Sequence, residues 1–189
     1  GATYGQVAKL TASDAAAGDN FGFSVAIDGA TVVVGAYGKE AVYVFRTRNG
    51  GATYGQVAKL TAADGAAGFG ESVSIDGATV VVGAHLGGSI YVFRTTDDGA
   101  TYDEVATLTP DDGTTHDEFG HSVAIDGDTI VVGARCDGIV GVITTVTCYS
   151  GSGAAYVFLD ERRWRHVRPG RQADGLRRCV VRPLRLLHG

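Results

Sequence analysis

Short apolar runs separated by turn residues recur along the first 158 residues of the chain. The clearest example, residues 19–45, reads DNFGFSVAIDGATVVVGAYGKEAVYVF. Its pieces return in the same order: an FG pair, an apolar run ending in IDG, the run VVVGA or IVVGA, and YVF. Successive FG pairs are 48 and then 50 residues apart, a period typical of propeller blades and solenoids.

Each repeat predicts a meander of antiparallel strands. In the first repeat, residues 21–27, 31–36 and 41–46 are short apolar runs bounded by turn residues, which indicates three strands. The run TVVVGA is apolar at nearly every position and therefore predicts cover on both faces. The Asp28-Gly29 pair predicts a type I′ hairpin, which needs positive φ at both central residues.

The segment GATYGQVAKLTA at residues 1–12 predicts a fourth strand, because its side chains alternate in polarity. It returns without change at residues 51–62 and in altered form at residues 99–110. The copy at residues 1–12 has no unit in front of it, so we expect it to be the last strand of a preceding blade. The remaining boundaries place repeats at 13–62, 63–110 and 111–158, an insertion at about 136–150, and a tail at 159–189.

The insertion lengthens the third repeat. Gly133 and Tyr156 are 23 positions apart, whereas the equivalent residues of the first repeat, Gly35 and Tyr43, are 8 apart. The inserted sequence contains IVGVITTV, which would extend the hairpin by two strand segments. A loop with a binding function is one interpretation, and an incidental insertion is the interpretation we favour.

The ordered set FG, SVAIDG, VVVGA and YVF over residues 1–158 resembles the FG-GAP repeats of β-propellers, the family of the integrin α-subunit head. Tyr37, His85 and Arg135 replace the third letter of GAP. The resemblance implies an all-β fold, a partial β-propeller of about three four-stranded antiparallel blades. Closed propellers have about four to eight blades, so this one is open rather than closed. We expect apolar surface on its terminal sheets and self-association of the chain.

Calcium-binding members of this family resemble Dx[DN]xDGxxD between the first two strands, where alternate oxygens surround the ion. The two-residue Asp-Gly turn of this chain has no room for such a set of ligands. The remaining candidate ligands lack the alternating spacing: they are Asp111, Asp112, Asp117 and Glu118. We therefore expect no metal and no cofactor, with calcium at these acids as the alternative.

Charge divides the chain near Phe158. Residues 1–158 contain 7 Lys and Arg against 18 Asp and Glu, whereas residues 159–189 contain 9 Arg against 3 acids. An acidic repeat region argues against a nucleic-acid surface, which needs a basic face. No apolar run approaches the length of a membrane span, and the 189 residues contain no signal-peptide pattern.

Two cysteines flank the insertion. Cys136 and Cys148 would close it as a disulfide in a secreted protein. Two free or buried thiols are the alternative.

No group of residues forms a catalytic arrangement. Ser24, Ser72 and Ser122 occupy the same strand position in successive repeats, which indicates a structural role. His121 and Ser122 are neighbours on a predicted strand, so their side chains point to opposite faces. We expect no catalytic residue and no enzyme.

The resemblance implies a non-enzymatic recognition or adhesion module of an extracellular or cell-surface protein. The loops of its blades would contact a protein or glycan ligand. Two alternatives stay open. One is an accessory propeller domain of a secreted hydrolase, and the other is a frameshifted gene fragment without activity of its own.

A change of reading frame explains the Arg-rich tail. Codons for RWRHVRPGRQADG, residues 163–175, exist that encode GGATYGQVAKLTA when read one base later. That product is the sequence of residues 50–62, and similar agreement continues through residues 176–187. We interpret residues 159–189 as a fourth repeat read out of frame and expect them to be disordered. An authentic basic tail is the alternative.

The nucleotide sequence across Tyr156 to Arg171 tests this interpretation. We expect its codons to yield GGATYGQV when the frame is moved by one base. Codons that cannot yield this sequence would show that the tail is authentic.

Overall fold

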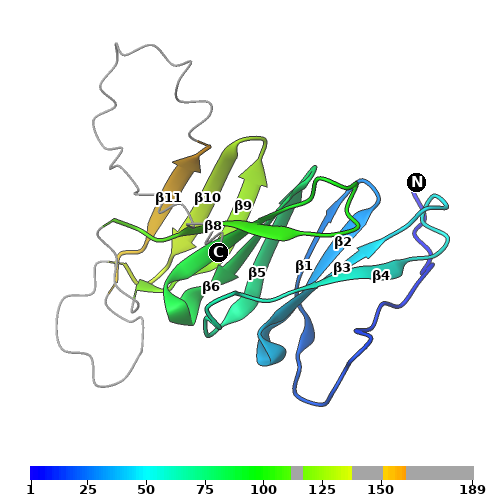
Figure 1. Cartoon of the computed structure of the whole chain (residues 1–189), viewed down its shortest axis with the longest axis horizontal. Helices are drawn as coiled ribbons and strands as arrows, with labels where there is room; N and C mark the ends of the chain where they lie inside the picture. The colour runs from blue at the N-terminus through cyan, green and yellow to red at the C-terminus, as the bar shows by residue number, and fades with distance from the viewer. Residues whose placement is uncertain (112–116, 138–150, 161–189) are drawn as a thin grey trace, which may run out of the picture.

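The chain folds as an open arrangement of three antiparallel sheets (Figure 1). We describe it from a computed structural model, which describes residues 1–111, 117–137 and 151–160. The strand orders are β1-β2-β3-β4, β5-β6-β7-β8 and β11-β10-β9. The strands are β1 (Phe21–Asp28), β2 (Thr31–Ala36), β3 (Ala41–Arg46), β4 (Gly55–Leu60), β5 (Phe69–Asp76), β6 (Thr79–Ala84), β7 (Ser89–Arg94), β8 (Asp103–Leu108), β9 (Phe119–Asp126), β10 (Thr129–Ala134) and β11 (Ala154–Leu159).

This architecture confirms the predicted all-β fold, a partial propeller that is not closed. The sheets lie side by side in chain order, and β5 contacts both β1 and β9 (Figure 1). The third sheet has three strands among the described residues. In the described part of the chain, no helix is long and apolar enough to cross a membrane.

The second strands of the first two sheets are largely buried, as predicted, whereas β10 of the third sheet is buried at only two of its six positions. The turn before the second strand differs from the prediction. β6 is buried at every position, because sheets pack against both of its faces. Asp28 pairs with Thr31, so Gly29 and Ala30 are the central residues of the first hairpin turn. Only Gly29 has positive φ, at 51°. A type I′ turn needs positive φ at both positions, so the prediction of that turn type was wrong.

Neighbouring sheets share an apolar core. We call the side of a sheet that faces the preceding sheet its front face, and the opposite side its back face. The back face of the first sheet contributes Val33 and Val44 to one cluster with Val73 and Ile75 of the second sheet. The equivalent contact joins the second and third sheets, where Val81 and Val92 belong to one cluster with front-face residues of the third. Burial of these side chains removes apolar surface from water and stabilises the stack.

A backbone contact fixes the spacing between sheets. The hydroxyl of Ser24 donates to the carbonyl of Gly70 at 2.8 Å, and that of Ser72 donates to the carbonyl of Gly120 at 2.7 Å. The same carbonyls lie against the glycine of the GA pair in the preceding sheet: a Cβ on Gly83 would lie 2.0 Å from the Gly120 oxygen. We call this arrangement the glycine–serine contact. It explains why each repeat has small residues at these three positions.

A second polar contact joins the hairpin turns. The amide of Gly77 donates to Oδ2 of Asp28 at 2.7 Å, and the amide of Gly127 donates to Oδ2 of Asp76 at 2.6 Å. The Asp of each of the first two Asp-Gly turns therefore accepts a hydrogen bond from the next sheet. Its role is to connect sheets.

Each of the first two sheets also buries one tyrosine with its hydroxyl satisfied. Tyr43 donates to Oδ1 of Asp14 at 2.6 Å, and Tyr91 donates to the carboxylate of Asp64 at 2.8 and 2.9 Å. Burial raises the pKa of both phenols, so they remain protonated donors. These bonds tie the link before each sheet to its third strand.

The outer faces of the first and third sheets expose apolar side chains, as predicted. On the front face of β1, Val25 is 67% exposed and Ile27 is 65% exposed, whereas the equivalent Val73 of β5 is 9% exposed. On the back face of the third sheet, Val131 and Val157 are 38% and 49% exposed. The difference follows from position alone, because the repeats place the same residue types there.

The strand predicted at residues 1–12 is not formed. This segment has no regular structure, and Tyr4 and Val7 are exposed. The identical sequence at residues 51–62 forms β4, which pairs with β3. A strand needs a neighbouring edge for its backbone hydrogen bonds, and the first copy has none. Its assignment to a preceding blade stays a prediction.

Two further predictions lie outside the described residues. They concern the strand segments at residues 139–146 within the insertion, and the out-of-frame tail beyond residue 160. Both stay predictions.

Replacement of Gly83 by Ala should destabilise the stack. The added Cβ would meet the backbone oxygen of Gly120, which cannot move without separating two sheets. We expect Gly83→Ala to lower the free energy of unfolding by about 1–3 kcal/mol, as overpacking does. Urea unfolding followed by circular dichroism measures this loss.

Gly133→Ala is the matched control. Its Cβ would meet the side-chain oxygen of Ser122, an exposed residue whose hydroxyl can rotate away. We expect a smaller loss of stability than for Gly83→Ala. Equal losses would contradict the importance of the glycine–serine contact.

Candidate functional site

The three repeats share a framework, and two of the positions at which they differ lie close together. One position follows the FG pair and the other follows the GA pair. Both lie at the same end of the strands, because β1 and β2 are antiparallel neighbours. We call these six side chains the end row: Phe23, Tyr37, Glu71, His85, His121 and Arg135.

Local backbone features position these side chains at one end of the sheets. The strand pairing shifts register between Phe21 and Ser24, with Gly22 at φ 92°, and the same irregularity recurs in β5 and β9. A bulge of this kind redirects the side chain that follows it. The 3₁₀ helices η1 (Tyr37–Lys39) and η2 (His85–Gly87) carry the second position in the first two sheets.

Rings of the end row follow one another from sheet to sheet. The ring centroids of Phe23 and Tyr37 are 5.0 Å apart, and the rings are stacked. Tyr37 stacks on His85 of the second sheet at 6.2 Å, and His85 lies 6.0 Å from His121 of the third. The row is thus continuous across three sheets and changes from aromatic to polar along its length.

The polar half of the row pairs with acids. Nδ1 of the buried His85 contacts Oε2 of Glu71 within the second sheet. Burial lowers the pKa of His85, an effect that the Arg135 and His121 charges reinforce and the Glu118 carboxylate opposes. The imidazole is therefore neutral at pH 7. Arg135 donates from Nε to Oε2 of the buried Glu118, and this hydrogen bond raises the pKa of Arg135.

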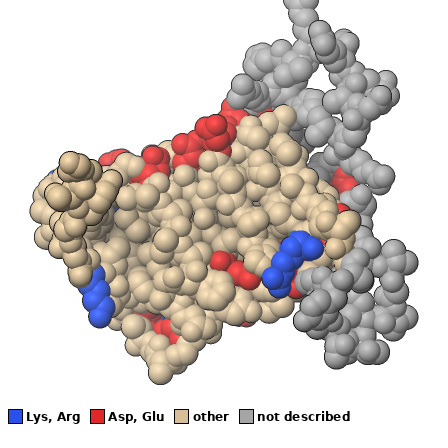
Figure 2. All heavy atoms as spheres, turned by 180° about the vertical axis from the view of Figure 1, so that it is seen from behind, with Lys and Arg blue, Asp and Glu red and all other residues tan. Residues whose placement is uncertain are grey.

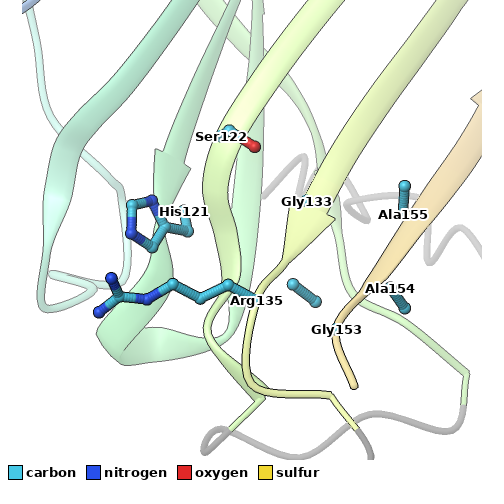
Figure 3. Close-up of a pocket in the computed structure, with 8 residues that line it drawn as sticks. His121, Ser122, Gly133, Arg135, Gly153, Ala154 and Ala155 are labelled. Carbon is cyan, nitrogen blue, oxygen red and sulfur yellow. The ribbon is translucent and has the colours of Figure 1, made fainter. Parts of the chain in front are cut away.

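A hollow of about 590 Å³ adjoins the row on the third sheet. Its lining consists of His121, Ser122, Gly133, Ala134, Arg135, Gly153, Ala154 and Ala155. In Figure 3 the side chains of His121 and Arg135 extend to one side of β9, and Ser122 points away from them. The hollow contains the Ser122 and Gly133 positions at which the other two sheets receive the carbonyl of a neighbouring glycine.

The candidate metal ligands that the structure describes do not gather into a site. No group of three or more His, Cys, Asp or Glu residues suited to a metal occurs among the described residues. Asp117 and Glu118 are buried, and Glu118 pairs with Arg135. Asp111 is exposed, and Asp112 lies outside the described residues.

A second acidic cluster, at residues 97–104, is also used within the fold. Oδ1 of Asp97 accepts from the hydroxyl of Thr95 and the amide of Thr101, and Oδ2 accepts from the Thr101 hydroxyl. These hydrogen bonds, with that of the Thr101 hydroxyl the largest contribution, lower the pKa of Asp97 to about 2. Asn49 accepts the equivalent hydrogen bonds in the first repeat. Asp97 therefore stabilises the loop between the third and fourth strands.

Two of the three serines, Ser24 and Ser72, have the structural role that the sequence indicated. Ser24 and Ser72 donate to glycine carbonyls, so neither is poised as a nucleophile. Cys136 is buried and disulfide-bonded. Cys148 lies outside the described residues, so the pairing of these two cysteines stays a prediction.

Sequence reasoning identified Tyr37, His85 and Arg135 as departures from GAP but did not place them in a site. The sequence did contain a signal for this site, because these positions vary while the surrounding strand residues repeat. The contacts of Tyr37 with Phe23 and of His85 with Glu71 depend on the register of the first two strands of each sheet, which the bulge sets.

Comparison with known proteins identifies the repeats. Residues 4–54, 54–102 and 102–158 each match the family model of the FG-GAP repeat. A search of curated protein sequences found no match. Among solved structures, the computationally designed Ika4 protein is similar, with 18% identity and a TM-score of 0.49 over 71% of this chain and 70% of Ika4.

Sqt1 of Saccharomyces cerevisiae is also similar, with 13% identity and a TM-score of 0.46. That similarity covers 76% of this chain and 36% of Sqt1. The family matches, by contrast, span almost all of the repeated region, from residue 4 to residue 158. The chain therefore belongs to the FG-GAP repeat family.

Proposed function

We propose that the chain is a non-enzymatic recognition module of an extracellular or cell-surface protein, which binds a protein or glycan ligand through the end row. The observation that carries this proposal is that the residues of the end row differ from repeat to repeat, whereas the surrounding strands repeat. Six neighbouring positions offer rings, an imidazole pair and a guanidinium, while the residues that join the sheets repeat.

The chemistry of the row suits recognition. Phe23 is 54% exposed, and Tyr37 is half-buried, so ring surface is available for an apolar ligand surface or the face of a sugar. Tyrosine and arginine contribute more than most residues to binding energy in protein interfaces. The Glu71–His85 and Glu118–Arg135 contacts fix the neighbouring side chains, which lowers the entropy lost on binding.

Two observations support the proposed location and ligand class. The disulfide of Cys136 suits an oxidising compartment. On the face shown in Figure 2, acidic side chains gather along one edge, and basic side chains are isolated rather than clustered. Such a surface favours a protein or glycan ligand over nucleic acid.

Substitution in the end row tests the proposal directly. We would apply the purified full chain to a printed array of neutral and acidic oligosaccharides and to immobilised collagen, fibronectin and laminin. For any ligand bound, Tyr37→Ala and His121→Ala should weaken binding about tenfold or more, as loss of an anchor residue does.

The matched control is Tyr4→Ala, which removes an exposed tyrosine that is not part of the row. We expect this variant to bind like the unmodified chain. Absence of binding on both surfaces, or equal loss in the control, would contradict the proposal.

The buried His85 should also make stability depend on pH. Its pKa is lower in the folded chain than the ordinary value of 6.5, so the unfolded chain binds more protons between these two values. Stability is therefore full above about pH 6.5 and is lost as the pH falls toward the lowered pKa.

We expect the free energy of unfolding in urea to fall between pH 7 and pH 5. His85→Tyr places the residue of the first repeat at this position and should reduce that fall. An equal pH dependence in the variant would show that His85 does not cause it.

A further inference from the structure

The two outer sheet faces of the chain resemble the two kinds of face that meet inside it. Within the chain, the back face of one sheet and the front face of the next meet twice. The front face of the first sheet and the back face of the third have no sheet against them in the described part of the chain. Their exposed residues, Val25 and Ile27 on one side and Val131 and Val157 on the other, are equivalents of buried residues inside.

The polar contact is incomplete at the same two faces. Ser122 and Gly133 line the hollow on the third sheet, where the first two sheets each receive a glycine carbonyl from the next. The matching glycine, Gly22 of β1, is exposed, and a Cβ on it would have nothing within 4 Å. A Cβ on its equivalent Gly70 would instead meet the carbonyl oxygen of Ala41 at 2.8 Å.

Residues 1–12 are a candidate partner for the outer edge of β11. β11 lacks a partner on its outer side among the described residues, whereas β3 and β7 pair there with β4 and β8. Residues 1–12 repeat the sequence that contains β4, have no regular structure and are exposed at Tyr4 and Val7. In the first two sheets the fourth strand leads directly into the front face of the next sheet, as residues 1–12 lead into β1.

We propose that two copies of this chain associate head to tail, with the first sheet of one copy on the third sheet of the other. Val25 and Ile27 cover Val131 and Val157, and Ser122 donates to the carbonyl of Gly22. Residues 5–10 of the incoming copy pair with β11. By the register of β3 with β4, Lys9 then lies opposite Tyr156, as Lys59 lies opposite Tyr43.

A second copy fits better than an unrelated partner, because both halves of the interface are already present in complementary form. Contacts between unlike faces close into a ring when the rotation permits. Two copies contribute six sheets, which lies within the range of about four to eight in closed propellers, whereas three copies exceed it. We therefore expect a closed dimer.

Variants of the two faces test the proposal by analytical ultracentrifugation of the full chain. Val25→Glu with Ile27→Glu changes only the front face, and Val157→Glu changes only the back face. Each variant alone should be monomeric at concentrations where the unmodified chain is dimeric. An equimolar mixture should regain a dimer, because each variant still has one intact face and the two are complementary.

Proline substitutions test the strand. Ala8→Pro with Lys9→Pro removes two successive amides, one of which must face β11 in a strand. Residues 1–12 have no regular structure in the single copy, so these changes should weaken the dimer at least tenfold without altering the circular dichroism of the monomer. Ala2→Pro, outside the paired residues, should leave the dimer unchanged.

Val105→Glu is the control for added charge, because Val105 is exposed on β8 away from both faces. It should associate like the unmodified chain. The proposal is overturned if the unmodified chain is monomeric up to 100 µM, if the front-face or back-face variant alone still associates, or if Val105→Glu abolishes association. If the unmodified chain forms assemblies larger than a dimer and the same variants abolish them, the contact between the two faces is correct but the closed dimer is not.

Discussion

The structure depends on the close approach of one backbone to the next at the glycine–serine contact. The carbonyl of an FG glycine occupies the space that a Cβ of the GA glycine would fill, and a serine hydroxyl satisfies it. Because this contact sets how closely the sheets approach, it also determines that valines from both meet in a common core. The glycine–serine contact and the packing of the valines between sheets therefore depend on each other.

The same contact positions the end row. Bulges at the FG pairs allow the glycine carbonyl to reach the preceding sheet, and the side chain that follows each pair belongs to the end row. Variation at the row therefore leaves the contact itself unchanged. This separation explains how one framework carries Phe23 in one sheet, Glu71 in the next and His121 in the third.

Much of the fold was predictable, because local sequence patterns specify the strands of a repeat and the strands then pair with their neighbours in the sheet. The two copies of GATYGQVAKLTA mark the limit: residues 51–62 contain a strand, and residues 1–12 have no regular structure. Their propensities are identical, so the neighbouring edge of β3 decides the outcome. The turn type failed for a related reason, since strand pairing extends to Asp28 and makes Ala30 a central turn residue. The site required contacts between sheets, such as that of Tyr37 with His85, which no local pattern specifies.

The central claim is that the glycine–serine contact stabilises the chain only where a following sheet supplies the carbonyl. Urea unfolding of Ser72→Ala and Ser122→Ala tests it most directly, at a concentration where the chain is monomeric. Ser72→Ala should lower the free energy of unfolding by about 1–3 kcal/mol, because it leaves the buried Gly120 carbonyl without its donor. Ser122→Ala should change it by less than about 0.5 kcal/mol. Equal effects of the two substitutions, or no effect of Ser72→Ala, would contradict the claim.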